Sequence, residues 1–428
     1  MFRRLILLIS VLLLAGCAGE PKDRPLVVWH WMTDRHQVFE ELATRYKEQT
    51  GVTVEFKKFF PPDIYSTKVI AAARAGTLPD VFGILGEKKI LASFVKAGHV
   101  VDFADALSQD GWKERFYPQA LAVTQFPAEN FYAVSEGYYG IPIDSMNMQF
   151  VYNKKLLRDA GLDENNPPRT FTDFIAFAKK IKDAGKQAGM DTEGFVCGWG
   201  EVWLMHCLAT EWAINLMGEE KFVNTLKGDV PYTDPQWIQV FSLFKQLKDE
   251  GVLYSDIVTM VNREAEDYFA RGRAAFAFDG SWSINVYNQL APDLDYGFFP
   301  IPAVAEGKPA PVWGGSGASF MVSSASSKKD EAIAFLKWLT EPEQQMFLVE
   351  KTNNLPAITG LEASLGEKLT MLLDDMDATT HPNVWPYEED SRVIEVMDKG
   401  LQQIVLGEKT PEEVAQKIEN MKSRLSSQ

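Results

Sequence analysis

Cysteine, histidine and positive charge are all scarce in this sequence of 428 residues. It contains three cysteines and five histidines, and 59 aspartates and glutamates outnumber 43 lysines and arginines. No group of cysteines and histidines has the multi-ligand spacing of a zinc site. The net charge of −16 disfavours a nucleic-acid partner, whose phosphates require a basic surface. The sequence therefore predicts no metal, no other cofactor and no nucleic-acid partner.

Signatures of catalysis are missing as well. The stretch "GGSGAS" (314–319) differs from the nucleophile elbow GxSxG because it lacks the final glycine. A glycosidase needs two carboxylates at a defined separation, and no pattern selects such a pair among the many acids. His30 and His36 are six residues apart, and we expect them at surface or helix-cap positions rather than in a metal site. A binding protein is therefore favoured over an enzyme.

The first residues form a targeting segment. Arg3 and Arg4 precede an apolar run over 5–15, which is too short to cross a bilayer and has the charge order of a signal peptide. The run ends in "LAGC", where Cys17 occupies the position of the lipidated cysteine in the lipobox of bacterial lipoproteins. An ordinary signal peptide with a chance cysteine is the alternative. We expect residues 1–16 to be a lipoprotein signal peptide and residues 17–25 a lipidated tether.

Cys197 and Cys207 are the two remaining cysteines. An exported protein enters an oxidising compartment, and a ten-residue spacing permits a disulfide between them. The sequence does not give the Cα separation that a disulfide requires. Two buried thiols remain an equal alternative.

The body of the chain reads as an α/β protein. Hydrophobic residues make up 46% of the sequence, enough for a large core, and the length favours two domains. Strand patterns at 24–31, 52–57 and 80–85 alternate with helix patterns, which predicts a parallel sheet with right-handed crossovers. The pattern restarts with a strand at 148–153 and an amphipathic helix from about 170. The sequence therefore predicts two α/β lobes with a cleft between them.

Tryptophans and carboxylates gather where this cleft is expected. In open α/β sheets, ligands bind beyond the carboxyl ends of the strands, and Trp31 and Asp34 follow the first strand while Glu87 follows the third. Later turns add further candidates of the same two kinds, together with two glycines that let a ligand approach the backbone. These are Trp199, Glu201, Trp203, Asp279, Trp282, Trp313, Gly314, Gly315 and Trp385.

Such a surface suits a sugar. An aromatic ring covers the apolar face of a pyranose, and carboxylates form charge-assisted hydrogen bonds with its hydroxyls. Several of the 11 tryptophans must instead fill the core, and Trp237, with apolar neighbours at helical spacing, is one of them.

Several stretches, in order along the chain, carry a resemblance to a known family. They are "PLVVWHW", "AGTLPDVFGIL", "YYGIPIDSMNMQFVYNKKLLRDAGLDENNPPRTFTDFIAFAKKI", "YFARGRAAFAFDGSWSINVYN", "DYGFFPIP", "WGGSGASFMVSSASSKKDEAIAFLKWLTEPEQQ" and "NNLPA". The chain resembles the sugar-type extracellular solute-binding proteins of ABC importers, the maltose-binding-protein-like group. The resemblance implies a fold like that of type II periplasmic binding proteins, in which each lobe is a mostly parallel sheet flanked by helices and the ligand cleft lies at the hinge. It places 26–143 and 298–328 in the first lobe, and 144–297 and 329–428 in the second.

The resemblance also implies roles for single residues. Trp282 would stack on a sugar, Trp385 lies near another aromatic position, and Glu87 and Glu201 match positions that bind hydroxyls. Asp34, Asp144, Asp279 and a turn at 313–315 are further candidates. After "PD" this chain has "FGIL" where an aromatic is found in the maltose binder, which favours a mono- or disaccharide over a long maltodextrin.

The expected function follows from these residues. A monomeric lipoprotein, facing the periplasm or the cell exterior, would capture a neutral sugar by hinge closure and deliver it to the membrane permease of an ABC importer. The same fold binding a polyamine, a glycerol phosphate or a peptide is an alternative, as is a surface-anchored glycosidase, adhesin or sensor.

Overall fold

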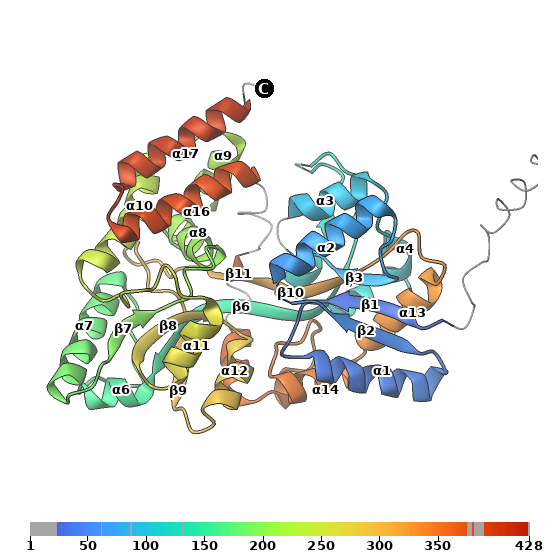
Figure 1. Ribbon diagram of the computed structural model, residues 1–428, viewed down its shortest axis with the longest axis horizontal. Coiled ribbons are helices and arrows are strands. Elements are labelled where there is room, and N and C mark those ends of the chain that lie inside the picture. Colours follow the sequence, from blue (N-terminus) through green and yellow to red (C-terminus); the bar gives the residue numbers. More distant parts are fainter. Residues whose placement is uncertain are drawn as a thin grey trace, which may run out of the picture.

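The computed structural model describes residues 24–60, 62–85, 88–130, 132–374, 379–380 and 389–426. Its helices and strands form two lobes, which two long strands connect across the middle of the molecule (Figure 1). Nine strands join into one sheet with the order β2-β1-β3-β10-β6-β8-β7, to which β9 and β11 are attached at the sides, and β4 and β5 form a separate two-stranded sheet. The two-lobed α/β architecture that the sequence predicts is confirmed.

The first lobe begins with the predicted alternation of strands and helices. Gly51 ends the first helix in the left-handed conformation, with φ of 78°, as its position after an amphipathic stretch predicts. Strands β1, β2 and β3 pair in parallel. The elements of this lobe are β1 (Leu26–His30), α1 (His36–Thr50), β2 (Val54–Lys58), α2 (Pro62–Ala75), β3 (Val81–Gly83), α3 (Lys88–Lys96), α4 (Ala104–Leu107), a 3-10 turn (Lys113–Arg115), α5 (Pro118–Ala122), β4 (Gln125–Phe126), β5 (Gly137–Tyr138), α13 (Lys329–Leu339) and α14 (Pro342–Thr352).

The second lobe packs its helices on both faces of the strands β7 and β8, which pair in parallel. The last helix begins with a capping box, as the sequence "TPEE" (410–413) predicts: the Thr410 and Glu413 side chains each accept a hydrogen bond from the other's backbone N–H. The elements of this lobe are α6 (Lys154–Asp159), α7 (Phe171–Gln187), β7 (Glu193–Val196), α8 (Trp203–Met217), α9 (Glu219–Lys227), α10 (Pro235–Asp249), α11 (Asn262–Ala270), β8 (Ala274–Gly280), α12 (Ser283–Leu290), β9 (Tyr296–Phe299), α15 (Glu367–Asp374), α16 (Ser391–Leu406) and α17 (Pro411–Ser426). A 3-10 turn (Glu362–Ser364) before α15 contacts the first lobe, where Glu362 accepts the hydroxyl of Tyr117.

Two antiparallel strands, β6 (Ile141–Asn153) and β10 (Val312–Val322), run through both lobes and form the hinge. The short β11 (Thr379–Thr380) pairs with the start of β10. A further segment passes beside them, because the backbone N–H of Ser145 donates to the carbonyl of Leu355 at 2.9 Å. The lobes are therefore joined along a hydrogen-bonded ladder rather than by loose linkers.

The pairing of these strands decides where a site can form. Strand β3 is antiparallel to β10, which is antiparallel to β6, which is antiparallel to β8. Strands β1 and β3 therefore point from the first lobe toward the middle, whereas β7 and β8 point from the second lobe toward the middle. The carboxyl ends of both parallel groups face each other between the lobes.

The packing corrects the predicted lobe boundaries in two places. Residues 299–313 belong to the core of the second lobe, and the chain returns to the first only from Ala318 onward. Helices α13 and α14, which the sequence placed in the second lobe, pack with β1, α1 and β2 in the first. Both boundaries were misplaced because β10 passes from the second lobe to the first within a single strand. No change of amino-acid composition marks the point where it crosses.

Candidate ligand-binding site

Trp203 and Trp282 form an aromatic pair at the carboxyl ends of β7 and β8. Trp282 follows β8 by two residues, and Trp203 is the first residue of α8. Their ring centroids lie 5.9 Å apart with a tilt of 51°, and both side chains are partly exposed. The structure therefore places two of the predicted residues together, and we refer to them as the tryptophan pair.

Glu201 connects this pair to the neighbouring helix. One of its carboxylate oxygens accepts the indole N–H of Trp203 at 3.1 Å, and the other accepts the backbone N–H of Asn262, the first residue of α11, at 2.8 Å. The carboxylate thus orients one tryptophan and satisfies an N–H group at the start of a helix. Glu201 remains partly exposed at the edge of the pair.

Asp279 lies behind the tryptophan pair, which corrects its predicted position beside the ligand. Only 2% of its surface is exposed, and its carboxylate accepts the hydroxyl of Tyr287 at 3.0 Å and the backbone N–H of Gly280 at 2.8 Å. Burial raises the pKa of Asp279 to about 7. Strand β8 continues through Gly280, so Asp279 is a strand residue rather than a turn residue.

The first lobe contributes Trp31, which follows β1 directly and is partly exposed. Its ring lies against Tyr65, with 5.3 Å between centroids, and over Gly83 at the end of β3. A Cβ atom on Gly83 would lie 2.4 Å from the Trp31 ring, so only glycine permits this packing. Trp31 therefore lies at the edge of the first lobe that faces the tryptophan pair.

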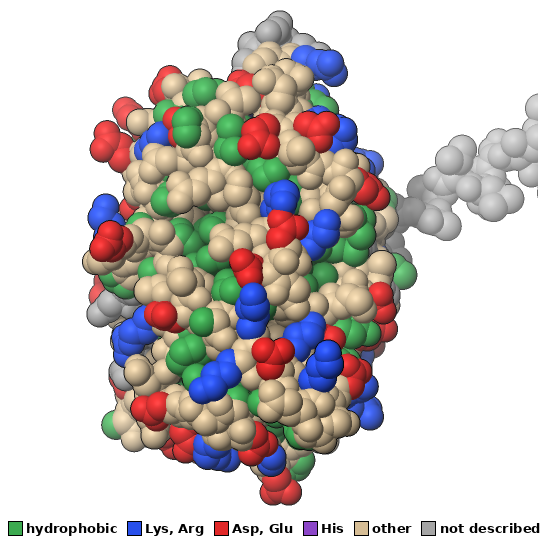
Figure 2. Space-filling model, turned by 90° about the vertical axis from the view of Figure 1, so that its left-hand side faces the viewer, with side chains coloured by type: hydrophobic (Ala, Val, Ile, Leu, Met, Phe, Trp, Pro, Cys, Tyr) green, Lys and Arg blue, Asp and Glu red, His purple; other side chains and the backbone are tan. Residues whose placement is uncertain are grey.

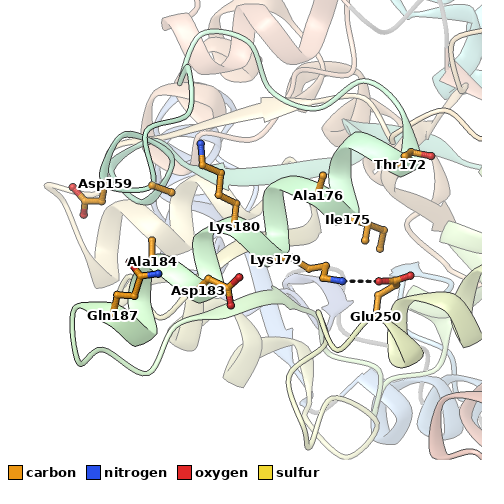
Figure 3. A pocket seen from close by; sticks show the side chains of 11 residues that line it. Asp159, Thr172, Ile175, Ala176, Lys179, Lys180, Asp183, Ala184, Gln187 and Glu250 are labelled. Carbon is orange, nitrogen blue, oxygen red and sulfur yellow. Dashed lines mark hydrogen bonds and ion pairs between the residues drawn. The ribbon is translucent and has the colours of Figure 1, made fainter.

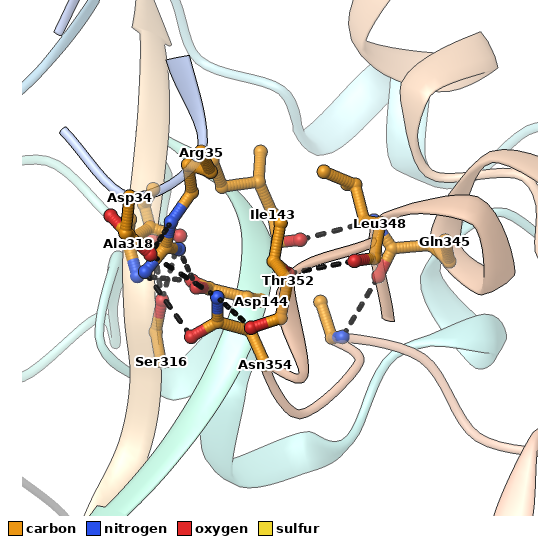
Figure 4. A network of polar contacts seen from close by, with 12 residues as sticks. Asp34, Arg35, Ile143, Asp144, Ser316, Ala318, Gln345, Leu348, Thr352 and Asn354 are labelled. Carbon is orange, nitrogen blue, oxygen red and sulfur yellow. Dashed lines mark hydrogen bonds and ion pairs between the residues drawn. The ribbon is translucent and has the colours of Figure 1, made fainter. Parts of the chain in front are cut away.

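Asp34 and Asp144, both predicted to bind the ligand, belong to a buried network around Arg35 (Figure 4). The Arg35 guanidinium bonds to Asp144, to Asp34 at 3.0 Å and to the side-chain oxygen of Asn354 at 3.2 Å. Asp144 also accepts the backbone N–H of Ala318 at 2.6 Å. These four side chains (Asp34, Arg35, Asp144 and Asn354), here called the hinge network, tie the first lobe to β6, β10 and the segment after α14.

Because the hinge network is buried, the charge of Asp144 depends on the neighbouring charge of Arg35. Arg35 is 8% exposed and Asp144 6% exposed. Burial raises the pKa of Asp144, and the Arg35 guanidinium counteracts that rise. The role predicted for Asp144 is therefore corrected, because its buried carboxylate is engaged by Arg35, a residue that the sequence did not single out. Asp34 is partly exposed and stays a predicted ligand contact.

Trp199 and Trp313 are core residues. Trp199 is fully buried and Trp313 is 3% exposed, and both pack in the core of the second lobe. The predicted turn at 313–315 is part of strand β10, where Gly314 and Gly315 pair with Asn147 and Met146 of β6. These predictions are wrong because a glycine-rich stretch can equally be a strand to which another backbone pairs closely. Glu87, Trp385 and the lipidation site Cys17 lie outside the described residues.

Cys197 and Cys207 are both buried free thiols, so the structure has no disulfide between them. Burial raises the pKa of each thiol well above its ordinary value. They therefore behave as small apolar residues of the core.

Two hollows lie away from the strand ends. A surface groove of about 790 Å³ runs along the outer face of α7, where Lys179 and Glu250 form an ion pair at 2.9 Å (Figure 3). On that side of the molecule, acidic and basic side chains are interspersed without a patch of one sign (Figure 2). A second cavity of about 290 Å³ lies between the lobes, with Lys88 and Phe126 from one lobe and Val223 and Leu226 from the other.

Sequence reasoning missed Asn262, Glu266, Arg35 and Met146. Met146, on β6 opposite Gly315, is partly exposed between the lobes. Asn262 and Glu266 lie one helical turn apart in "NREAE", just before the stretch that carries the resemblance. The four-residue spacing of Asn262 and Glu266 places them on the same face of a helix. An acid on a buried helix face needs a polar partner, so this spacing could have indicated a polar site.

Two lobes on a shared pair of hinge strands, with aromatic and carboxylate side chains on their facing edges, define a hinged binding protein. The chain belongs to the family of bacterial extracellular solute-binding proteins, whose model matches residues 41–371. Among the described residues, no helix is both long enough and apolar enough to cross a membrane.

Relatives with known ligands share about a quarter of the residues. The chain is 22% identical over 377 residues to the melibiose/raffinose/stachyose-binding protein MelE of Bacillus subtilis (84% of this chain, 82% of that protein). It is 24% identical over 346 residues to the sn-glycerol-3-phosphate-binding periplasmic protein UgpB of Brucella abortus (77% and 74%). It is 23% identical over 369 residues to a maltooligosaccharide ABC transporter solute-binding lipoprotein of Streptococcus pneumoniae (82% and 78%).

A solved structure of a chitin oligosaccharide binding protein superimposes with a TM-score of 0.79 at 22% identity, covering 95% of this chain and 100% of that one. This likeness supports the fold assignment.

Proposed function

We propose that the protein captures a sugar between its lobes and delivers it to the permease of an ABC importer. The observation that carries the proposal is the tryptophan pair at the carboxyl ends of β7 and β8, while Trp31 lies at the carboxyl end of β1 in the other lobe. Partly exposed rings offer apolar faces to the C–H groups of a pyranose, and the neighbouring Glu201 offers a carboxylate to its hydroxyls. Relatives that bind melibiose, raffinose, stachyose and maltooligosaccharides support a sugar ligand.

Cys17 would anchor this receptor. A lipidated cysteine after a cleaved signal peptide holds the protein at the membrane surface, with residues 18–25 as a tether. The family is extracellular, and the relative from Streptococcus pneumoniae is a lipoprotein, which supports this arrangement. A monomer that binds without catalysing a reaction would then dock on the permease in its closed form.

Glycerol phosphate is the second candidate ligand, because UgpB is a relative of similar identity. The surroundings of the tryptophan pair do not favour it. Glu201, Glu266 and Asp279 are all acids, and Arg263, on the same helix as Glu266, is paired with Glu266. A phosphate would need cationic side chains there that are not already paired with acids.

Intrinsic tryptophan fluorescence of residues 18–428 tests the proposal. The protein is titrated with melibiose, raffinose, stachyose, maltotriose and chitobiose, and then with sn-glycerol 3-phosphate and putrescine. We expect a saturable change with at least one sugar and no product in the recovered ligand. A response to glycerol phosphate or putrescine alone would overturn the sugar assignment, and turnover would overturn the receptor assignment.

An ion pair between the lobes should favour the closed form. Lys89 at the start of α3 lies 3.2 Å from Asp390, which precedes α16 in the opposite lobe. Exposed pairs contribute about 0.2–1 kcal/mol, so Lys89→Gln is expected to weaken binding of the responding sugar by roughly 1.5–5-fold. The difference from wild type should shrink in high salt.

The matched control is Lys337→Gln, which breaks an ion pair with Asp110 that lies within the first lobe. Calorimetric titration of both variants at low and high salt makes the comparison. Equal affinities for Lys89→Gln and wild type at low salt would show that the pair does not bias closure.

A further inference from the structure

The sheet of the first lobe changes its direction of winding between β1 and β3. Strand β1 pairs with β2 on one side and with β3 on the other. Helices α1 and α2, which make the two crossovers, lie on opposite faces of these strands and pack in different core clusters (Figure 1). In such a sheet a ligand binds beyond the carboxyl ends of the two strands at this point. The ends of β1 and β3 are therefore where the first lobe can meet a ligand.

The hydroxyl of Tyr65, on α2, lies between the ends of these two strands. The last backbone pair of β1 and β3 is Trp29 with Phe82. Just beyond it, the Tyr65 oxygen lies 3.0 Å from the Trp29 carbonyl and 2.8 Å from the Gly83 carbonyl, and it accepts the Gly83 backbone N–H at 3.0 Å. A hydroxyl has one proton, so the two carbonyls share it. This side-chain oxygen thus takes the place of backbone pairing where the ladder ends.

The ring of Tyr65 supports Trp31. The two ring centroids lie 5.3 Å apart with a tilt of 43°, and Trp31 also packs over Gly83. Tyr65 is fully buried, so it cannot contact a ligand, whereas Trp31 is partly exposed. Burial raises the pKa of Tyr65, so the hydroxyl keeps the proton that its hydrogen bonds require. Any effect of Tyr65 on binding must therefore pass through the residues that it holds.

We propose that Tyr65 is a positioning residue of the ligand site, which links the ends of β1 and β3 and supports Trp31 as a stacking surface in the first lobe. This inference rests on the proposed function, since it concerns the first lobe's part of the same sugar site. A partly exposed indole ring without support can change rotamer, and a ligand that binds it must then fix its orientation. A ring that is already held in place avoids this loss of freedom on binding.

Two variants disturb this arrangement at different atoms. Tyr65→Phe keeps the ring but removes the hydroxyl, which leaves the buried Gly83 N–H without its acceptor. Gly83→Ala keeps the hydroxyl but places a methyl group 2.4 Å from the Trp31 ring. Outside that ring, the nearest atom to this methyl group is the Ser319 carbonyl oxygen at 3.4 Å, which is an ordinary contact. The alanine therefore acts chiefly on Trp31.

Tyr152→Phe is the matched control. Tyr152 is buried in the second lobe, and its hydroxyl donates to the backbone carbonyl of Glu164 at 3.0 Å. It pairs with Phe276 of β8, four residues before the end of that strand at Gly280, so it lies away from the strand ends. The control removes the same atom from the same type of buried residue.

Hydrogen exchange at the Gly83 amide, followed by NMR, is the readout that needs no ligand. Tyr65→Phe should speed this exchange roughly tenfold relative to the amides of β2, because the Gly83 N–H has lost its hydrogen bond. Tyr152→Phe should leave the rate unchanged. An unchanged rate in Tyr65→Phe would overturn the link between the strands.

Affinity for the sugar that responds in the fluorescence panel is the second readout, measured by calorimetric titration. Tyr65→Phe should bind it roughly three- to tenfold more weakly, the change expected for one lost hydrogen bond, and Gly83→Ala should also weaken binding. In a Trp31→Ala background, either substitution should change the affinity by less than about twofold, because no ring remains to be positioned. Tyr152→Phe should bind as wild type does.

The outcomes separate this inference from the proposed function. If the sugar binds but Tyr65→Phe has wild-type affinity, or has the same effect with and without Trp31, the receptor stands and the positioning role is overturned. If no sugar binds, the proposed function fails and the positioning role fails with it. If Tyr65→Phe does not fold, the Gly83→Ala cycle decides, and wild-type affinity in Gly83→Ala would overturn the inference.

Discussion

Replacing Arg35 with methionine is expected to lower the free energy of unfolding by roughly 3–5 kcal/mol, a large share of the stability of an ordinary domain. The variant leaves the Asp144 carboxylate buried without its cation, and it also releases Asn354. The hinge network ties the first lobe to β6, β10 and the segment after α14. The lower stability should therefore appear as a shift of one cooperative urea unfolding transition of the whole protein.

Two further variants test whether the lower stability of Arg35→Met comes from the unpaired Asp144 carboxylate. Asp144→Asn in the Arg35→Met background keeps an acceptor for the Ala318 N–H and removes the unpaired charge, so it should recover more than half of the loss. Arg271→Met breaks an exposed pair with Asp267 and should leave the urea midpoint close to that of wild type. If Arg35→Met loses no more than Arg271→Met, the hinge network does not stabilise the protein as described.

Trp282→Ala is expected to weaken binding of the responding sugar by roughly 30-fold or more, equivalent to about 2 kcal/mol, as for a central aromatic contact. The substitution removes the ring that lies against Trp203 and that would cover the apolar face of the sugar. Calorimetric titration well below the unfolding temperature measures the change in Kd directly.

Trp338→Ala is the control for this prediction. Trp338 packs on Tyr46 within the first lobe and donates to Gln49 at 2.7 Å, away from the facing strand ends. It should reduce stability but leave the Kd unchanged. A Trp282→Ala protein with wild-type affinity would mean that Trp282 is a packing residue and that the ligand lies elsewhere.

Most of the fold could be predicted from local patterns. The strand at 26–30, the helix that ends at Gly51 and the Thr410 capping box each depend on residues close together in the sequence. The lobe boundaries could not be predicted, because β10 changes lobes within a single strand.

The site was predictable only in part. Trp203, Trp282 and Glu201 were found because they follow strands, and parallel strand ends meet at one edge. The engagement of Asp144 by Arg35 joins residues 109 positions apart, and the contact of Glu201 with Asn262 spans 61 positions. No local pattern distinguishes an acid that meets a ligand from one that a distant arginine or amide already occupies.

Because β10 crosses from one lobe to the other, it also determines when during synthesis the two lobes can fold. Strand β10 pairs with β3 in one lobe and with β6 at the centre, and α13 and α14 complete the core of the first lobe. A nascent chain that has not reached residue 322 therefore lacks the strand on which both halves depend, although its first 300 residues are already made. Contacts so distant in sequence form slowly. Neither lobe can therefore complete its sheet until most of the chain has been made, so both lobes are expected to finish folding late in synthesis.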